Sequence, residues 1–423
     1  MNIVRAASGK AVKAFMIGLL VAGIATVAAF HAPSVMFARP GWFDGGIRLL
    51  RDDGEVSYYF LHSSWIDRSG QAVTLTQDYP PLGVLYFSLP RLLTKNFEAF
   101  EVAFVSLNAV LYALLFVVMS LLLDGEGRSK RRLAFFLLPA FLYFSLWRFD
   151  ILPTLLAAGA LLAAKRKAPE PAFLLLLAAA MAKWYAALFF PPFFIYFALL
   201  GGREIPIKRL QNAIFLTAGA GIALIALVAS VAGFGALVEP VLFHLSRDFE
   251  MGSVGAVLLT GMRAVGIDRP LLHGALARLF FLMQFAAVIP VVWKEYPKDF
   301  RSLVRACVFV LIPFMALGSV FSAQWIVWLA PLVLVVADAT DLALLAALDL
   351  TVFVQFPVLF GINPYGSAYA VFTFIRSGLF AALWWRNSRA FFSRAQRMPQ
   401  TLPEAGGQLP PLSGSYSNRK AIR

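Results

Sequence analysis

The chain has 423 residues, of which 60% are hydrophobic and only 14% are charged. Soluble domains carry about 45–50% apolar and about 25% charged residues, so this composition excludes an ordinary soluble fold and indicates an all-α polytopic membrane protein. The net charge is +14, but the 37 basic residues are dispersed in short loops between apolar runs. That distribution is the one that fixes membrane topology, and it argues against nucleic acid as a partner.

The cysteines, histidines and sequence motifs indicate which metals and cofactors the protein could bind. A single cysteine, Cys307, lies in an apolar run, which excludes an intrachain disulfide and a cysteine metal site. The four histidines show no spacing typical of metal ligands, and there is no P-loop and no GxGxxG motif. We therefore expect no metal and no cofactor. One alternative stays open, because the acidic group Asp52, Asp53 and Glu55 could hold a divalent cation.

The first apolar run, 14–36, follows three basic residues and has no small-residue cleavage site. It is therefore expected to be a retained first span rather than a signal peptide. The polar loop after it, 37–80, would then face away from the cytoplasm. Residues 79–93 are apolar but short and contain three prolines, so they are expected to lie in the interface or to dip into the membrane.

Residues 97–123 predict the next span, and the basic segment 125–132 returns the chain to the cytoplasmic side. The apolar stretches 133–164 and 168–202 each lie between two basic loops. Each is too short for two full crossings of about 20 residues. Both are expected to be short hairpins, tilted or partly embedded in protein.

The remaining spans follow the basic loop 203–209. They are expected at 213–237, 274–293, 304–323, 325–338, 341–360 and 369–385. A polar connector, 239–253, and an amphipathic stretch to about residue 270 separate the first two. The total is about twelve spans with both ends inside. Residues 1–397 would form one membrane domain with an outer segment at 37–93, and the Pro-, Gly- and Ser-rich tail 398–423 is expected to be a disordered cytoplasmic tail.

The outer loop 37–80 holds six of the 23 acidic residues. A carboxylate there could act as a general base on a hydroxyl nucleophile. Asp44 is the first candidate for that catalytic role. The other candidate acids are Asp52, Asp53 and Asp78. Each has a structural alternative, because Asp44 could cap a helix, the Asp-Asp-Gly sequence is typical of a turn, and Asp78 could end a loop.

Polar residues outside this loop also collect on the predicted outer face. Three of them could stabilise a phosphate, either bound or leaving: Lys183, His244 and Arg247. Others could support the same site: Tyr79, Arg148, Asp150, Tyr185, Glu250, Ser253 and Gln324.

These groups have structural alternatives too. Arg148 could pair with Asp150 at the first hairpin tip, and Lys183 at the second tip could reach the membrane interface. The spacing of His244, Arg247 and Glu250 predicts one polar helical face. The tryptophans at 325 and 328 are expected in an interfacial aromatic belt.

Six segments, in order along most of the chain, resemble the polytopic GT-C glycosyltransferases. They are FDGGIRLL (43–50), DYPPLGVLY (78–86), RFDILPTLLAAGALLAAKRK (148–167), LLLAAAMAKWYAALFFPP (175–192), FHLSRDFEMGS (243–253) and FSAQWIVWLAPLV (321–333). They are most similar to glycosyltransferase family 87, the polyprenol-phosphate-mannose-dependent mannosyltransferases. The resemblance implies a GT-C-like bundle with a long first outer loop that carries short interfacial helices.

The resemblance also implies a chemistry. The sugar would be carried on a polyprenyl phosphate and transferred with inversion, with a carboxylate of the first outer loop as general base. Asp44 matches that carboxylate by position, and the cations at 183, 244 and 247 match the basic positions near the donor phosphate. The chain departs from the family because two glycines follow Asp44 where a tyrosine-containing segment is usual. The neighbouring pair Asp52 and Asp53 therefore stays an alternative.

The resemblance thus implies an inverting hexosyltransferase, with mannose as the expected sugar and a lipid or glycan as the acceptor. Its place would be a bacterial inner membrane, with the site on the periplasmic face. A twelve-span secondary transporter is one alternative, although transporters place polar groups near the midplane and often repeat their halves. A non-catalytic lipid-binding subunit is the other.

Overall fold

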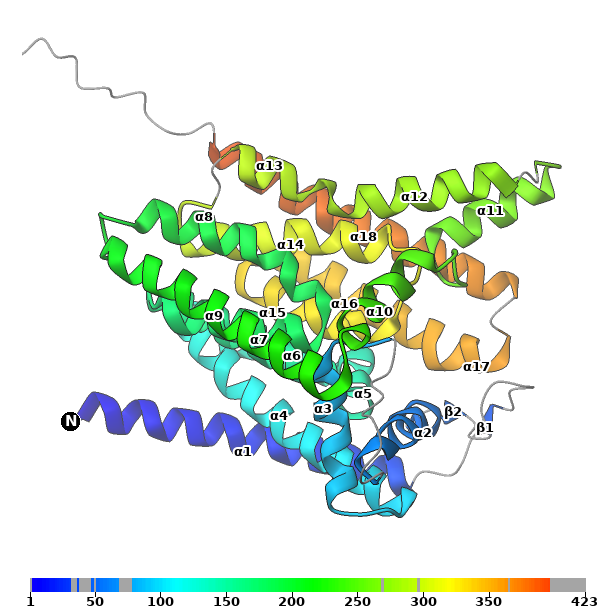
Figure 1. Ribbon diagram of the computed structural model, residues 1–423, viewed down its shortest axis with the longest axis horizontal. Coiled ribbons are helices and arrows are strands. Elements are labelled where there is room, and N and C mark those ends of the chain that lie inside the picture. Colours follow the sequence, from blue (N-terminus) through cyan, green and yellow to red (C-terminus); the bar gives the residue numbers. More distant parts are fainter. Residues whose placement is uncertain are drawn as a thin grey trace, which may run out of the picture.

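The computed structural model describes residues 2–31, 36–37, 47–48, 51–67, 78–267, 270–294, 297–363 and 366–395. Nearly all of these residues are helical (Figure 1). The predicted all-α architecture is therefore confirmed. The two short strands in this part of the chain, β1 (Met36–Phe37) and β2 (Ile47–Arg48), form an antiparallel pair between α1 (Asn2–His31) and α2 (Asp53–His62).

The helices vary widely in length. They are α1 (Asn2–His31), α2 (Asp53–His62), α3 (Pro81–Ser88), α4 (Phe97–Gly125), α5 (Pro139–Trp147), α6 (Ile151–Lys165), α7 (Pro169–Ala182), α8 (Phe190–Leu200), α9 (Ile207–Ala232), α10 (Gly235–Ser246), α11 (Val254–Ala264), α12 (Pro270–Ala286), α13 (Val288–Trp293), α14 (Phe300–Ala316), α15 (Ile326–Val336), α16 (Ala339–Phe353), α17 (Phe360–Ile362) and α18 (Ser367–Ala395). Segments of 3₁₀-helix lie at Ser64–Asp67, Leu89–Leu92, Lys130–Leu137, Trp184–Phe189 and Ala323–Trp325, and a π-helical segment lies at Val354–Leu359.

Six helical stretches in the described residues are long and apolar enough to cross a membrane. They are Gly9–His31, Phe97–Gly125, Ile207–Ala232, Leu272–Trp293, Ala339–Ile362 and Ser367–Arg389. The pair α5 and α6 is a seventh if it is counted as one broken span. The protein is thus a multi-pass membrane protein. Twelve crossings would require shorter helices to enter the membrane as well, and that number stays a prediction.

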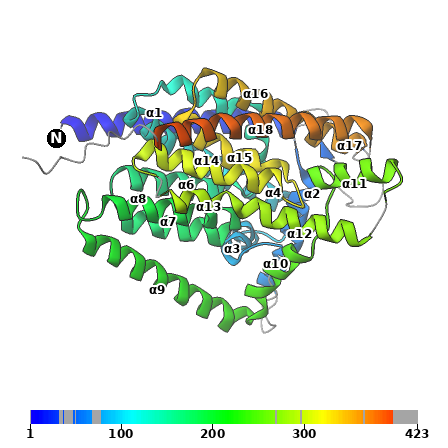
Figure 2. The same cartoon turned by 90° about the horizontal axis from the view of Figure 1, so that it is seen from above.

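The long helices lie side by side, and α9 runs along one edge of the molecule with α16 at the opposite edge (Figure 2). Helices α3, α5 and α10 lie near the middle of the molecule in Figure 1, with α2 to their right. The segment predicted to be interfacial, 79–93, contains the short helix α3. Most of its side chains are buried in protein, and α3 packs against α2 and α7.

The chain breaks at the two predicted hairpin tips. Arg148 is extended between α5 and α6, which are bent by 108° relative to each other. Lys183 is extended between α7 and the 3₁₀ segment that follows it. A break inside an apolar region leaves backbone carbonyls that need new donors. Both breaks therefore require polar side chains from elsewhere in the fold.

Asn108 supplies those donors at the first break. It is fully buried in α4, and its amide nitrogen donates to the carbonyl oxygens of Leu146 (2.7 Å) and Arg148 (3.1 Å). The hydroxyl of Tyr86 donates to the Asn108 amide oxygen (2.6 Å) and fixes the orientation of the amide. One polar residue within an otherwise apolar helix thus stabilises the extended backbone that carries Arg148.

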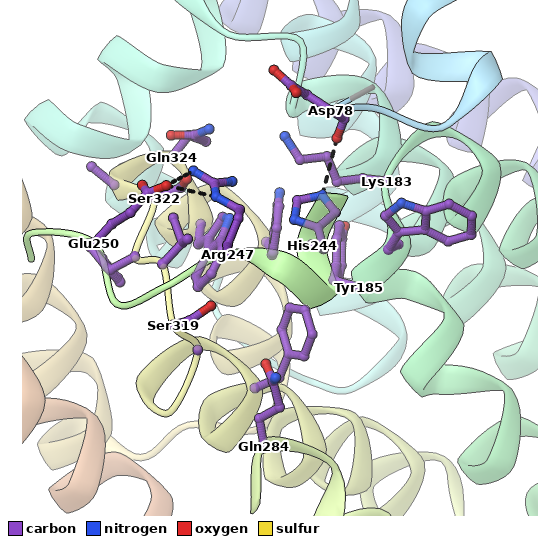
Figure 3. A pocket seen from close by; sticks show the side chains of 18 of the residues that line it. Asp78, Lys183, Tyr185, His244, Arg247, Glu250, Gln284, Ser319, Ser322 and Gln324 are labelled. Carbon is purple, nitrogen blue, oxygen red and sulfur yellow. Dashed lines mark hydrogen bonds and ion pairs between the residues drawn. The ribbon is translucent and has the colours of Figure 1, made fainter. Parts of the chain in front are cut away.

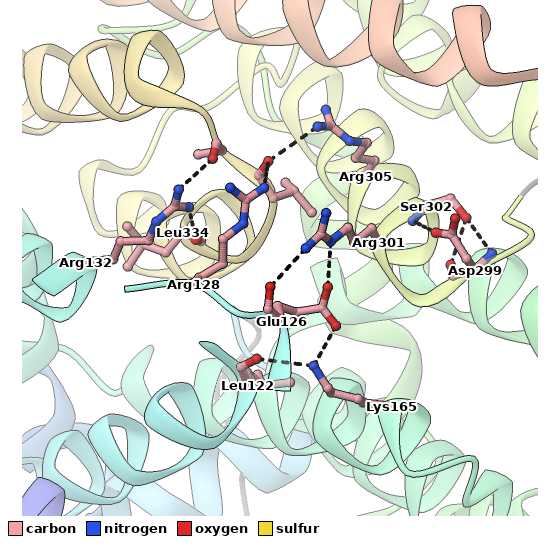
Figure 4. A network of polar contacts seen from close by, with 12 residues as sticks. Leu122, Glu126, Arg128, Arg132, Lys165, Asp299, Arg301, Ser302, Arg305 and Leu334 are labelled. Atoms are coloured by element: carbon pink, nitrogen blue, oxygen red, sulfur yellow. Dashed lines mark hydrogen bonds and ion pairs between the residues drawn. The ribbon is translucent and has the colours of Figure 1, made fainter. Parts of the chain in front are cut away.

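A polar network joins the loops that the sequence predicts to lie together on the inner side (Figure 4). The carboxylate of Glu126 accepts from Lys165 (2.5 Å) and Arg301 (2.7 Å). Arg132 donates to the carbonyls of Leu334 (2.7 Å) and Ala337 (2.9 Å) at the end of α15. Cations are favoured there because the last carbonyls of a helix carry partial negative charge. The loops predicted to share one face therefore share one end of the bundle.

Candidate functional site

A cavity of about 730 Å³ lies among α2, α3, α10, α12 and α14 and the two helix breaks (Figure 3). It collects most of the polar residues that the sequence singled out. Those that line it are Asp52, Asp78, Tyr79, Arg148, Lys183, Tyr185, His244, Arg247, Glu250 and Gln324. Residues from six separate segments of the sequence thus share one cavity.

Two described candidates, Asp150 and Ser253, do not line it, and for two others the structure does not answer the question. Asp150 lies buried directly behind Lys183. Ser253 is the N-cap of α11, where its hydroxyl accepts from the backbone N–H of Ala256 (3.1 Å), so its visible role is structural. Asp53 begins α2, but its side chain is outside the described residues, and Asp44 lies outside them entirely.

Arg148 pairs with the acidic loop. Its guanidinium forms ion pairs with Asp52 (2.5 Å) and with Glu55. The alternative in which Arg148 pairs with Asp150 is therefore wrong. The Asp-Asp-Gly sequence is not a simple turn either, because Asp52 is the N-cap of α2 and accepts from the N–H of Glu55 (3.3 Å). An aspartate at this position stabilises the helix start, so the cap places both carboxylates beside Arg148.

The two carboxyl groups respond differently to the same arginine. Burial raises the pKa of Asp52 in spite of the nearby Arg148 charge. Burial also opposes ionisation of Glu55, but the Arg148 charge and the hydrogen bond from Tyr59 (2.8 Å) together lower the pKa of Glu55 below its usual value. Glu55 is thus the carboxylate that the fold stabilises in its charged form.

This difference predicts opposite pH dependences for two isosteric variants, Glu55→Gln and Asp52→Asn. The stabilisation by Glu55 is fully present above its unfolded-state pKa and is lost as the pH falls through its lower folded-state pKa. Asp52 has a raised folded-state pKa, so its ionisation costs stability as the pH rises through that value. Thermal unfolding in detergent between about pH 4 and pH 7 measures both effects.

We expect the deficit of Glu55→Gln relative to the parent protein to grow toward pH 7. Asp52→Asn should instead gain relative stability toward pH 7, helped by asparagine being as good an N-cap as aspartate. Parallel pH dependences for the two variants would contradict this assignment of charge.

Lys183 lies on a second wall of the cavity, where Asp150 holds it. The ammonium nitrogen lies 3.3 Å from a carboxylate oxygen of Asp150, and the same oxygen accepts from the indole N–H of Trp328 (2.7 Å). Lys183 also lies over the rings of Phe149 (4.3 Å) and Tyr79 (4.7 Å). It does not extend to the membrane interface, because this set of contacts keeps it in the protein.

The tryptophans at 325 and 328 form a stack instead of an interfacial belt. Trp328 is only 3% exposed and stacks on Tyr185 with ring centroids 3.9 Å apart. Trp325 stacks on Trp328 at 5.2 Å. The belt prediction is wrong because hydropathy does not distinguish a ring facing lipid from a ring facing a cavity wall. The stack gives Asp150 a rigid hydrogen-bond donor.

The third wall carries His244, Arg247 and Glu250. Helix α10 ends at Ser246, so the predicted single helical face is wrong. Arg247 instead turns back to donate to Glu250 (2.7 Å), and the imidazole Nε2 of His244 lies 3.2 Å from the backbone carbonyl of Asp78. These contacts are drawn in Figure 3. The end of α10 is thereby tied to the outer loop across the cavity.

Asp78 lies where the outer loop meets α3. Its carboxylate accepts a hydrogen bond from the hydroxyl of Tyr58 (2.5 Å). In the part of the chain that the structure describes, Asp78 forms no ion pair. The other described acids that line the cavity are paired, Asp52 and Glu55 with Arg148 and Glu250 with Arg247. Asp78 could therefore accept a proton without first breaking an ion pair.

One part of the remaining lining is apolar and continues to the protein surface. It includes Leu188, Pro191, Val241, Leu245, Phe281, Phe285, Val288 and Phe314. Val241 and Leu245 on α10 and Phe285 on α12 are also among the large apolar side chains exposed at the surface. In a membrane such surface contacts lipid, so an apolar chain could pass between α10 and α12 into the cavity.

Sequence reasoning missed several residues that matter here. Asn108 and Arg376 are polar residues inside long apolar runs, and that anomaly could have found both. Tyr58 carried no signal, because its role depends on the position of Asp78. The sequence indicated Glu55 as a possible cation ligand but gave no sign that it pairs with Arg148.

Within the described ranges, no group of three or more His, Cys, Asp or Glu side chains is arranged to hold a metal ion. The cation alternative at residues 52, 53 and 55 includes a side chain beyond those ranges, so it stays untested. No model of a known protein family, no curated protein and no solved structure matches the chain.

Proposed function

We propose that this protein is an inverting membrane hexosyltransferase that uses a polyprenyl-phosphate sugar, such as the mannose donor, as its substrate. The acceptor would be a lipid or a glycan. The observation that supports it is the composition of one cavity: carboxylates that include Asp78, which forms no ion pair in the described ranges, cations that each lie beside a carboxylate, and an apolar wall that reaches the protein surface. A lipid-linked anionic donor needs the last two features, and a hydroxyl acceptor needs the first.

The cations are arranged so that a phosphate can join them. Arg247 and Glu250 have side chains 24% and 47% exposed, and exposed pairs contribute only about 0–1 kcal/mol, so a phosphate could engage the guanidinium at low cost. The Lys183 ammonium nitrogen lies 3.3 Å and 3.4 Å from the two carboxylate oxygens of Asp150, and an ammonium group has three donors. Both side chains could therefore bind the donor phosphate without losing their structural partners.

The transfer step balances with one base and one leaving group. The acceptor oxygen attacks the anomeric carbon as a carboxylate accepts the hydroxyl proton. The bond from the anomeric carbon to the phosphate oxygen breaks, and the polyprenyl phosphate leaves as an anion stabilised by Lys183 and Arg247. Asp44 is the candidate base from the sequence, and Asp52 and Asp78 are the described alternatives.

The proposal includes a topology. The short helices near the cavity, together with the long spans, would complete the twelve crossings. The network around Glu126 would face the cytoplasm because basic loops are retained there. The cavity would then open on the periplasmic side of a bacterial inner membrane.

Purified protein in proteoliposomes with a radiolabelled polyprenyl-phosphate mannose donor and a membrane lipid extract as acceptor tests the function. We expect label to move from the donor to a product of different mobility, with release of polyprenyl phosphate. Glu170→Gln is the matched control, because Glu170 pairs with Arg209 on the surface, away from the cavity. It should retain full transfer.

Two other outcomes would overturn the proposal. Accumulation of a solute inside the vesicles without sugar transfer would indicate a transporter. Saturable binding of polyprenyl phosphate without turnover, across several acceptor classes, would indicate a non-catalytic lipid-binding subunit.

A further inference from the structure

Arg376 is an anomaly in this fold. It lies within α18, is only 2% exposed and is among the largest fully buried side chains. Across the described ranges it has no carboxylate partner. Removing an unpaired guanidinium from water costs several kcal/mol, so such a residue is retained only where its hydrogen bonds serve a purpose.

Those hydrogen bonds go to two distant segments. One nitrogen, Nη1, donates to the side-chain oxygen of Gln355 (2.5 Å), and Nη2 donates to the backbone carbonyl of Gly252. The guanidinium carbon also lies 3.4 Å from the ring centroid of Phe321. The amide of Gln355 is oriented in turn, because its nitrogen donates to the hydroxyl of Thr373 (2.7 Å). The contacts with Gln355 and Phe321 thus fix the orientation of the guanidinium that binds the Gly252 carbonyl.

Gly252 ends the loop that carries Arg247 and Glu250. The loop is held at two backbone points: the N–H of Glu250 donates to the carbonyl of Ser319 (2.9 Å), and the carbonyl of Gly252 accepts from Arg376. Gly252 has a φ of +84°, and a Cβ atom there would lie 2.8 Å from the Tyr369 hydroxyl. Its close packing leaves the loop little freedom near that end.

We propose that Arg376 is a positioning residue for the donor site. By binding the Gly252 carbonyl, it fixes the Arg247–Gly252 loop so that the Arg247 guanidinium faces the cavity. Arg376 is absent from the cavity lining and acts through Arg247. This inference rests on the proposed function, since Arg247 is taken to bind the donor phosphate.

A double-mutant cycle tests it. Arg376→Gln and Arg247→Gln are each expected to lower kcat/KM for the polyprenyl-phosphate donor at least tenfold, with the acceptor KM within about threefold of the parent. The double variant should be no worse than the worse single variant, because both remove the same interaction. Arg376→Lys, which keeps one charged donor, should recover part of the donor affinity.

Additive effects in the double variant, or an equal rise in KM for donor and acceptor, would show a general structural role and overturn the proposal. If Arg376→Gln is not recovered folded, Gly252→Ala tests the same end of the loop, because its added Cβ would meet the Tyr369 hydroxyl and shift the backbone that Arg376 binds. It is expected to lower kcat/KM for the donor and leave the acceptor KM unchanged, and an unchanged donor kcat/KM would overturn the proposal. Stabilisation of the parent protein by polyprenyl phosphate is a separate readout. If the parent neither transfers sugar nor gains stability with this lipid, the proposed function fails, and the role of Arg376 fails with it.

Discussion

Replacing Lys183 by methionine is expected to reduce sugar transfer at least about 100-fold, because one of the charges that stabilise the leaving phosphate is lost. The same change leaves Asp150 fully buried without its cation. Breaking a buried pair by removing one partner costs about 3–5 kcal/mol. Transfer from the labelled donor in proteoliposomes and the thermal midpoint in detergent measure the two effects separately.

The double variant Lys183→Met with Asp150→Asn separates chemistry from folding. The asparagine is neutral and keeps an oxygen that can accept from Trp328, so the stability lost in the single variant should largely return. The activity should not return, since the phosphate still lacks its cation. Parental transfer by either variant would exclude Lys183 from the donor site.

Asp44→Asn is expected to abolish transfer while the protein stays folded in the membrane. General base catalysis contributes about 10²- to 10⁴-fold, and asparagine has nearly the same shape as aspartate but cannot accept the proton. The comparison is with Asp52→Asn and Asp78→Asn, measured under the same conditions. Under this assignment both comparison variants keep substantial activity.

The same three variants also identify the general base if Asp44 does not have that role. Full activity of Asp44→Asn, with a large loss in Asp78→Asn, would move the role to the acid that accepts a hydrogen bond from Tyr58. A large loss in Asp52→Asn alone would move it to the Arg148 partner, which would have to leave its ion pair to act. Intact size-exclusion profiles in detergent are needed for each variant, because a misfolded protein would imitate the expected result.

The pairing inside the cavity explains how acids and bases can coexist there. Arg148 pairs with Asp52 and Glu55, and Asp150 pairs with Lys183 and accepts from the Trp328 indole. The fold thus holds each of these two cations beside a carboxylate at its own place in the cavity.

The amino-acid sequence by itself determined the class of protein and the placement of its breaks. Long apolar runs must be helical in lipid because their backbone groups have no water to bind, so composition predicts helices directly. Charged residues are costly at membrane depth, so Arg148, Asp150 and Lys183 marked the places where helices end. The same reasoning applied to Arg376 and Asn108 would have singled out two more polar side chains with structural work to do.

Only the tertiary structure decided the partners. Arg148 is two residues from Asp150 in the sequence, yet it pairs with acids from a loop about a hundred residues away, because the 108° bend turns its side chain toward α2. Trp328 faces Asp150 rather than lipid because the packing of the helices decides in which direction its ring points. Periodicity and hydropathy describe one segment at a time, whereas a charge pair depends on where two segments meet.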